Sequence, residues 1–205
     1  MKKIRIAEIS VALALVIAVV FSVVGFGKEC EDIRDDVVRL HILANSDSEN
    51  DQQVKLAVRD ALLNSGKDIF NGELNVNTAK EKLESQKSEL VSIADNVLKE
   101  NGFDYTAQIY LTKEYFTTRT YENFTLPAGE YLALKVILGN GEGHNWWCVM
   151  FPPLCLPAAS ENTNIDAVFS EEGADIIQSS AKYEMRFKII ELFESMKSRF
   201  YTKLH

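Results

Sequence analysis

The segment GHNWWCVMFPPLC, from Gly143 to Cys155, gathers several residues that could do chemistry. His144 precedes Cys148 by four residues, and a cysteine becomes a useful nucleophile when a neighbouring base or cation lowers its pKa. On an extended strand, two residues four apart lie about 13 Å from each other. A catalytic pair would therefore need the glycine-rich turn to fold His144 back, or His41 to approach Cys148 from a neighbouring strand.

The same residue types also raise the question of a metal site. Zinc sites usually contain close ligand pairs, with two cysteines or two histidines separated by a few residues. The sequence has no such pair, which leaves open only a site built from His41, His144 and one thiolate. We expect no metal and no other cofactor.

A disulfide is a third possibility. Cys148 and Cys155 flank two prolines that could turn the chain back on itself. A disulfide needs the two Cα atoms about 5.5–6 Å apart, and disulfides persist in exported proteins. Cys148 and Cys155 are therefore a candidate disulfide, and Cys30 would stay reduced or pair with a second chain.

Trp146 and Trp147 offer a fourth possibility, which is recognition of a partner. Adjacent residues of a strand point to opposite faces of the sheet. One indole can enter the core, whereas the other must cover the sheet or be exposed. Exposed tryptophans are frequent hot spots of binding, so this strand is a candidate contact surface.

The elements that position these residues follow from hydrophobic spacing. Residues 37–45 alternate between apolar and polar and predict a strand with one buried face. A helix is predicted over 47–70, with a stop signal at 64–66. Thr78 and Glu81 fit a capping box that opens a second helix, 78–101.

Three further strands are predicted at 105–112, 131–138 and 145–151. A last helix is predicted over 181–203, where the apolar residues lie mostly on one side: Tyr183, Phe187, Ile190, Leu192 and Phe193. This order predicts an α+β domain with a small antiparallel or mixed sheet of about four strands and three main helices, preceded by an apolar helix.

The first residues of the chain predict export. Lys2, Lys3 and Arg5 precede an uncharged stretch of 19 residues, Ile9–Gly27, which as a helix nearly spans a hydrocarbon core of about 30 Å. The basic end should stay in the cytoplasm. We expect residues 1–27 to be a signal peptide or a transmembrane anchor, with retention favoured because the cleavage signal is poor. Residues 28–36 are expected to be a linker and 37–205 the exported domain.

Charge and composition exclude some function classes. The chain has 205 residues, of which 46% are hydrophobic and 25% charged, and its formal net charge is −8. We expect no nucleic-acid partner because there is no basic block to bind phosphates. Without residues 1–27 the formal charge is −10, so binding to anionic lipid through net charge is not expected either.

Three stretches resemble the stage II sporulation protein R family. They are VVRLHILANSDSENDQQVKLAVRDAL at 37–62, TRTY at 118–121 and LPAGEYLALKVILGNGEGHNWWCVMFPPLC at 126–155. The resemblance implies a protein that is exported from the forespore into the space between forespore and mother cell. It implies that the protein triggers a membrane-embedded aspartic-type protease, which then processes the sigma-E precursor. The expected partner is this protease, and no small-molecule substrate is expected.

The resemblance implies a signal and not an enzyme, and it brings no catalytic residues with it. The polar and aromatic residues of the matching stretches are candidates for recognition: Arg39, His41, Asn45, His144, Asn145, Trp146 and Trp147. Two alternatives stay open. One is a secreted Cys/His hydrolase that acts on the cell wall or on the protease, and the other is a wall-binding module that uses the two tryptophans.

Overall fold

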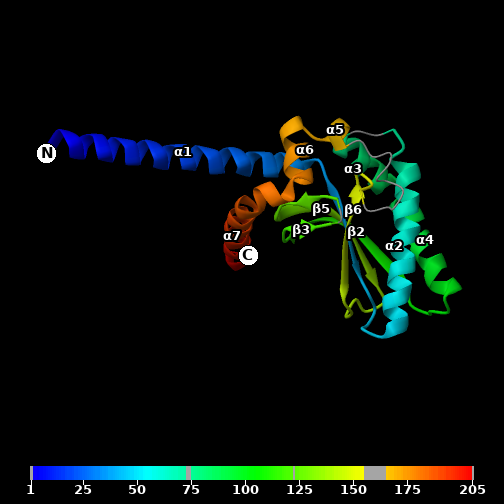
Figure 1. Ribbon diagram of the computed structural model, residues 1–205. Helices are drawn as coiled ribbons and strands as arrows, with labels where there is room; N and C mark the ends of the chain where they lie inside the picture. The colour runs from blue at the N-terminus through cyan, green and yellow to red at the C-terminus, as the bar shows by residue number, and fades with distance from the viewer. Residues whose placement is uncertain (1, 73–74, 122, 155–164, 205) are drawn as a thin grey trace.

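The computed structural model describes residues 2–72, 75–121, 123–154 and 165–204 (Figure 1). Its centre is a four-stranded sheet in the order β2-β5-β1-β6. The strands are β1 (Val38–Leu43), β2 (Ala107–Phe116), β5 (Gly129–Leu138) and β6 (Asn145–Phe151). β1 runs parallel to β5 and antiparallel to β6, and β2 runs antiparallel to β5. The predicted α+β class with a mixed sheet is confirmed.

The predicted strands are found, and the largest difference lies in β2. The prediction ended this strand at Thr112, whereas β2 continues to Phe116. The reason is pairing, because β2 follows β5 over ten residues, from Ala107 opposite Leu138 to Phe116 opposite Gly129. The bounds of β6, 145–151, agree with the prediction.

One face of the sheet is covered by three helices, α2 (Glu49–Ile69), α3 (Val76–Ser85) and α4 (Lys87–Glu100) (Figure 1). Alternate residues of the strands enter this core, among them Leu40, Val136 and Cys148. The apolar stripes of α2 and α4 pack against them. This layer contains the larger of the two clusters of buried apolar residues.

Two predictions about these helices were wrong in detail. The predicted stop at 64–66 does not end α2, because Gly66 lies inside the helix and leaves room for the side chain of Met150. The single helix predicted over 78–101 is two helices that meet at Gln86. Asn75, and not Thr78, caps the first of them. The break lets the buried sides of both helices face the core.

The other face of the sheet is covered at one end only. The covering elements are the C-terminal part of α1 (Lys2–Asp35), the hairpin β3–β4 (Arg119–Thr120 and Thr125–Leu126), α5 (Ile165–Val168), α6 (Glu171–Gln178) and α7 (Ser180–Leu204). The hairpin was not predicted from the sequence. This second core holds Phe116, Tyr131 and Val149 from the strands, together with apolar residues of the covering elements.

Helix α1 is long and projects from the domain (Figure 1). Among the described residues it alone is long and apolar enough to cross a membrane, with a candidate span at Ile6–Asp35. Residues 28–36, expected to be a linker, continue this helix through Asp35 and bury Cys30 and Ile33 in the second core. The end of the apolar helix is thus part of the folded domain.

Helix α7 has the predicted extent, but its apolar residues do not share one side. Phe187 and Ile190 are buried in the second core, and Tyr183 packs against it. Leu192 and Phe193 instead have exposed fractions of 63% and 59%. They lie on a different side of the helix, away from the residues that contact the domain.

Candidate functional site

Side chains from all four strands meet on the sheet face that lies opposite α2 and α4. We call them the sheet-face cluster, and its members are His41, Glu114, Lys135, Asn145 and Trp147. The strand order places them together, because β1 lies between β5 and β6 and β2 pairs with β5.

His41 is buried and is held at both ring nitrogens. Its Nδ1 lies 2.7 Å from a carboxylate oxygen of Glu114, and its Nε2 lies 2.9 Å from Oδ1 of Asn145. A protonated imidazole satisfies both acceptors, whereas a neutral one donates to only one of them. Neither nitrogen is left to serve an outside group, which favours a positioning role over base catalysis.

Glu114 lies between two basic side chains. Lys135 donates to its second carboxylate oxygen at 2.6 Å, while His41 occupies the first. Burial by itself would raise the pKa of Glu114, but the hydrogen bonds from Lys135 and His41 outweigh it and hold the pKa below its usual value. The carboxylate therefore stays charged and fixes both neighbours.

Trp147 is the aromatic member of the cluster that reaches the surface, where exposed Asn145 and partly exposed Lys135 also lie. Its indole stacks on His41 with 3.7 Å between ring centroids, and its ring meets that of Phe116 at an edge-to-face distance of 4.9 Å. The guanidinium of exposed Arg119 lies 5.7 Å from the indole. Trp147 remains half-buried, so its ring is rigidly held, flanked by a cation and partly open to solvent.

Arg39 supports this surface from inside and has no exposed area. Its Nε donates to the carbonyl of Cys148 at 3.0 Å, and its Nη2 donates to the hydroxyl of Tyr121 at 2.7 Å. The guanidinium also lies over Phe116 and Tyr131, 4.3 and 5.0 Å from their ring centroids. No carboxylate pairs with Arg39 in the part of the chain that the structure describes. As a recognition candidate, Arg39 can act only through the residues it holds.

The remaining candidates lie elsewhere. Asn45 accepts a hydrogen bond from the backbone of Asn140 and donates to Asp51, which ties β1 to the turn after β5. His144 is exposed and its ring contacts Asp47. Trp146 packs against the core on the helical side of the sheet, so the two tryptophans point to opposite faces, as predicted.

The contacts of Trp146 and of the nearby turn are with other parts of the domain, and they stabilise the fold. The guanidinium of Arg59 lies 4.6 Å from the Trp146 ring centroid. Asp51 is buried and accepts from Ser46 and Tyr105 in addition to Asn45. Burial would raise the pKa of Asp51, but these hydrogen bonds lower it on balance. The RLHILANSDS stretch therefore supplies a turn and a helix cap beside the glycine-rich loop.

The catalytic Cys/His arrangement is not formed. Cys148 pairs with Leu40 across the sheet and packs among the residues of the helical face, while the next residue along, His41, points to the other face. Cys148 is also not a free thiol. Its candidate disulfide partner, Cys155, lies outside the described residues, so that pairing stays a prediction.

Glu114, Lys135 and Arg119 were not predicted as site residues from the sequence. Lys135 carried a usable signal, because it is the single charged residue of the predicted strand 131–138. Glu114 carried none, since the predicted strand ended before it. Only the β2–β5 pairing brings this carboxylate to His41.

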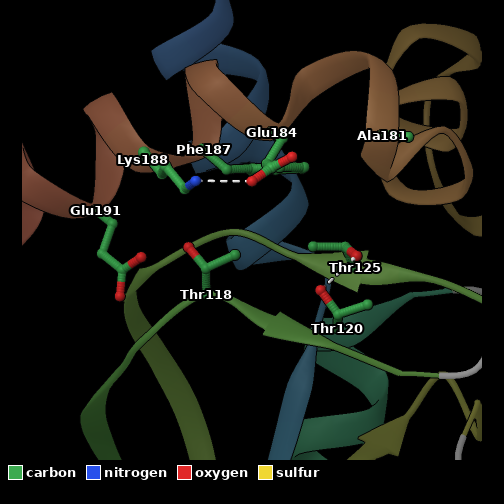
Figure 2. Close-up of a pocket in the computed structure, with 8 residues that line it drawn as sticks. All are labelled: Thr118, Thr120, Thr125, Ala181, Glu184, Phe187, Lys188 and Glu191. Carbon is green, nitrogen blue, oxygen red and sulfur yellow. Dashed lines mark hydrogen bonds and ion pairs between the residues drawn. The ribbon is translucent and has the colours of Figure 1, made fainter.

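A pocket of about 390 Å³ lies between the β3–β4 hairpin and α7 (Figure 2). It is lined mainly by hydroxyl and charged groups, from Thr118, Thr120, Thr125, Ala181, Glu184, Phe187, Lys188 and Glu191. Figure 2 shows Lys188 paired with Glu184 across one side. Within the described residues the buried hydroxyl of Thr118 has no hydrogen-bond partner.

These features define a class of protein, an α+β domain behind an apolar N-terminal helix that presents an aromatic and charged sheet face. The family model for stage II sporulation protein R matches residues 34–161, and the chain belongs to this family. The chain is 41% identical over 123 residues to "Stage II sporulation protein R" of Bacillus subtilis (strain 168), which covers 60% of this chain. The match spans about half, 55%, of that relative. No solved structure matches the chain.

Proposed function

We propose that this chain is an exported sporulation signal. It acts in the space between forespore and mother cell and triggers the membrane-embedded aspartic-type protease that processes the sigma-E precursor. Membership of the stage II sporulation protein R family supports the sporulation role. The apolar helix α1 supports export, with residues 9–27 as an anchor that leaves the domain on the outer side.

The observation that carries the proposal is the stack of Trp147 on His41. The imidazole is held by Glu114 and Asn145 at both nitrogens, and the side chain of Cys148 points to the opposite face of the sheet. A site in which the ring of His41 is fixed at both nitrogens and Cys148 faces the other way is suited to binding. Interface hot spots have this character, since a preorganised aromatic side chain loses little entropy on association.

Binding can trigger a protease without any chemistry on the part of the signal. A ligand shifts a conformational equilibrium when it binds one state of its partner more tightly than the other. The sheet-face cluster would bind the active state of the protease more tightly, and a tenfold preference corresponds to about 1.4 kcal/mol. Because the protease would return to its inactive state when the signal dissociates, the signal would have to stay bound while the protease is active.

The test is reconstitution in a non-sporulating bacterial host that carries the matching protease and the sigma-E precursor. The host receives this chain as wild type, Trp147→Leu, Arg119→Ala or Trp146→Leu. We expect wild type to cause cleavage and Trp147→Leu to lose at least tenfold. Arg119→Ala removes an exposed contact beside Trp147 without touching the core and should weaken cleavage as well.

Trp146→Leu is the matched control, because it changes the neighbouring tryptophan on the opposite side of the same strand. It should retain most of the activity at equal abundance. Absence of cleavage with wild type would overturn the signalling function. Full activity of both Trp147→Leu and Arg119→Ala would leave the function standing but remove the sheet-face cluster as its contact surface.

A further inference from the structure

Helix α7 presents an apolar stripe to solvent. The stripe consists of Met185, Ile189, Leu192, Phe193 and Met196, whose exposed fractions are 72%, 46%, 63%, 59% and 47%. Their spacing of three and four residues places them on one side of the helix. Single exposed apolar residues are common, but a contiguous row of five large ones marks a surface that binds something.

The stripe lies opposite the side of α7 that packs on the domain. Phe187, Ile190 and Glu194 are buried against the second core, and Tyr183 stacks on Phe26 of α1. At about 100° per residue, the centre of the stripe is turned by roughly a third to a half of a circle from these residues. One side of α7 is therefore buried against the domain, and the stripe on the other side stays exposed to solvent.

The position of α7 relative to α1 indicates what covers the stripe. Exposed apolar residues of α1 continue to Val24, and the next apolar residue, Phe26, is buried against Tyr183 and Phe187 of α7. Ile190 lies beside Gly27, where the uncharged stretch ends. If α1 spans a bilayer, the first turns of α7 lie at the level where α1 leaves the bilayer.

The direction of α7 agrees with this placement. Figure 1 shows α7 on the side of the domain from which α1 projects, running across the direction of α1. A helix that crosses the direction of a membrane-spanning helix at its outer end lies along the membrane surface. Its uncovered side, away from the domain, then faces the bilayer.

Charge along α7 adds an independent argument. Residues 180–204 contain six basic and three acidic residues, a net charge of +3 in a chain whose net charge is −8. Arg186 borders the stripe on one side, and Lys188 borders it on the other, where it also pairs with Glu184 at the pocket. Lys182 lies at the start of the stripe and pairs with Asp175. Glu191 and Glu184 lie toward the hairpin and line the pocket there. Basic residues beside an apolar stripe are typical of helices that lie in the headgroup region.

We propose that α7 docks on the outer surface of the membrane that α1 crosses, with its apolar stripe in the boundary between headgroups and acyl chains. The occupant of the stripe is the lipid surface itself. This docking would fix how the domain is oriented above the membrane and would hold the sheet-face cluster in one direction. The expectation that the acidic domain does not attract anionic lipid concerns its net charge, whereas α7 by itself carries a net charge of +3. The inference rests on retention of α1 and does not depend on which protein is the signalling partner.

The test is depth-dependent fluorescence quenching of the full chain in lipid nanodiscs. The variant Phe193→Trp places a reporter in the stripe, and lipids brominated near the headgroup end of the acyl chain serve as quenchers. Wild type supplies the background from Trp146 and Trp147. We expect Phe193→Trp to lose fluorescence beyond this background, and to lose more in discs containing phosphatidylglycerol at low salt than in phosphatidylcholine discs.

The matched control is Tyr110→Trp, which places the same reporter at an exposed position of β2. It should show no quenching beyond wild type. Equal fluorescence of Phe193→Trp in brominated and plain discs of both compositions would overturn the proposal. In that case the stripe would be free for a protein or a second copy.

A second measurement keeps the proposal falsifiable if the reporter disturbs α7. Leu192→Ser and Met185→Ser change residues that are exposed in the structure, so the fold should be retained by circular dichroism. A spin label at Ser195 in each background should become more accessible to a water-soluble relaxant than in the otherwise unchanged chain. Unchanged accessibility in both backgrounds would count against lipid contact.

Discussion

The imidazole of His41 and the indole of Trp147 lie nearly parallel, with 3.7 Å between their centroids and 13° between their planes. This stack joins the central strand β1 to the outer strand β6 on the side of the sheet that faces away from Cys148. It explains how this chain can place His, Trp and Cys on neighbouring strands without forming a Cys/His catalytic pair. The histidine orients the tryptophan, and the cysteine packs with the core behind it.

Glu114 should stabilise the domain in a pH-dependent way. Glu114→Gln removes the charge that holds Lys135 and His41, and we expect it to lower the free energy of unfolding by about 1–2 kcal/mol at neutral pH. The folded-state pKa of Glu114 lies below its ordinary value of 4.5. Its contribution is therefore fully present above about pH 4.5 and is lost as the pH falls through the lower folded-state pKa. Denaturant unfolding at pH 7 and pH 3 measures this, and a difference between wild type and variant that does not shrink at pH 3 would contradict it.

Arg39 should tolerate an apolar replacement better than a lysine. In Arg39→Lys a compact ammonium cannot reproduce both hydrogen bonds and the contact with the rings of Phe116 and Tyr131, so a poorly paired charge is left buried. We expect a loss of about 2–4 kcal/mol in the free energy of unfolding. Arg39→Met keeps the ring contacts without a charge and should cost less. Chemical denaturation of both variants shows which of them is less stable. Equal stability of Arg39→Lys and wild type would refute the argument.

Gly143 should not accept a side chain. A Cβ at this position would lie 2.2 Å from the backbone carbonyl oxygen of Ser46, and a backbone atom cannot move aside as a side chain can. Gly143→Ala should therefore push the loop off β1, weaken the hydrogen bond from its amide to Ala44, and cost about 1–3 kcal/mol. The neighbouring exposed change Glu142→Ala should stay within about 0.5 kcal/mol of wild type. Thermal unfolding of the two variants side by side measures the contrast.

Cys148→Ser separates signalling from hydrolysis. Because Cys148 faces the helical core and His41 the opposite face, the serine variant should still cause precursor cleavage in proportion to its folded amount. Its stability should fall, since a hydroxyl replaces a sulfur in an apolar environment and the predicted disulfide with Cys155 can no longer form. Cleavage assays normalised to soluble, folded protein test this. Complete loss of cleavage with an intact fold would revive the hydrolase hypothesis.

Local pattern predicted most of the elements but not all of their ends. β6 was predicted with its bounds, because seven strand-forming residues lie between a glycine-rich turn and two prolines. The end of α2 was misplaced because Gly66, usually a stop signal, is used inside the helix to accommodate Met150. That difference comes from a contact with another element, which local spacing does not contain.

The sequence by itself determined the α+β class, the apolar N-terminal helix, the opposite orientation of the two tryptophans and the family. All of these depend on periodicity, composition or long strings of residues. Only the tertiary structure decided which candidates meet. The pairing of β2 with β5 and of β1 with both β5 and β6 brings Glu114 and Lys135 to His41 and Trp147, and separates His41 from Cys148. Such contacts join residues up to about a hundred positions apart, and they depend on strand order, which alternation along a single strand cannot encode.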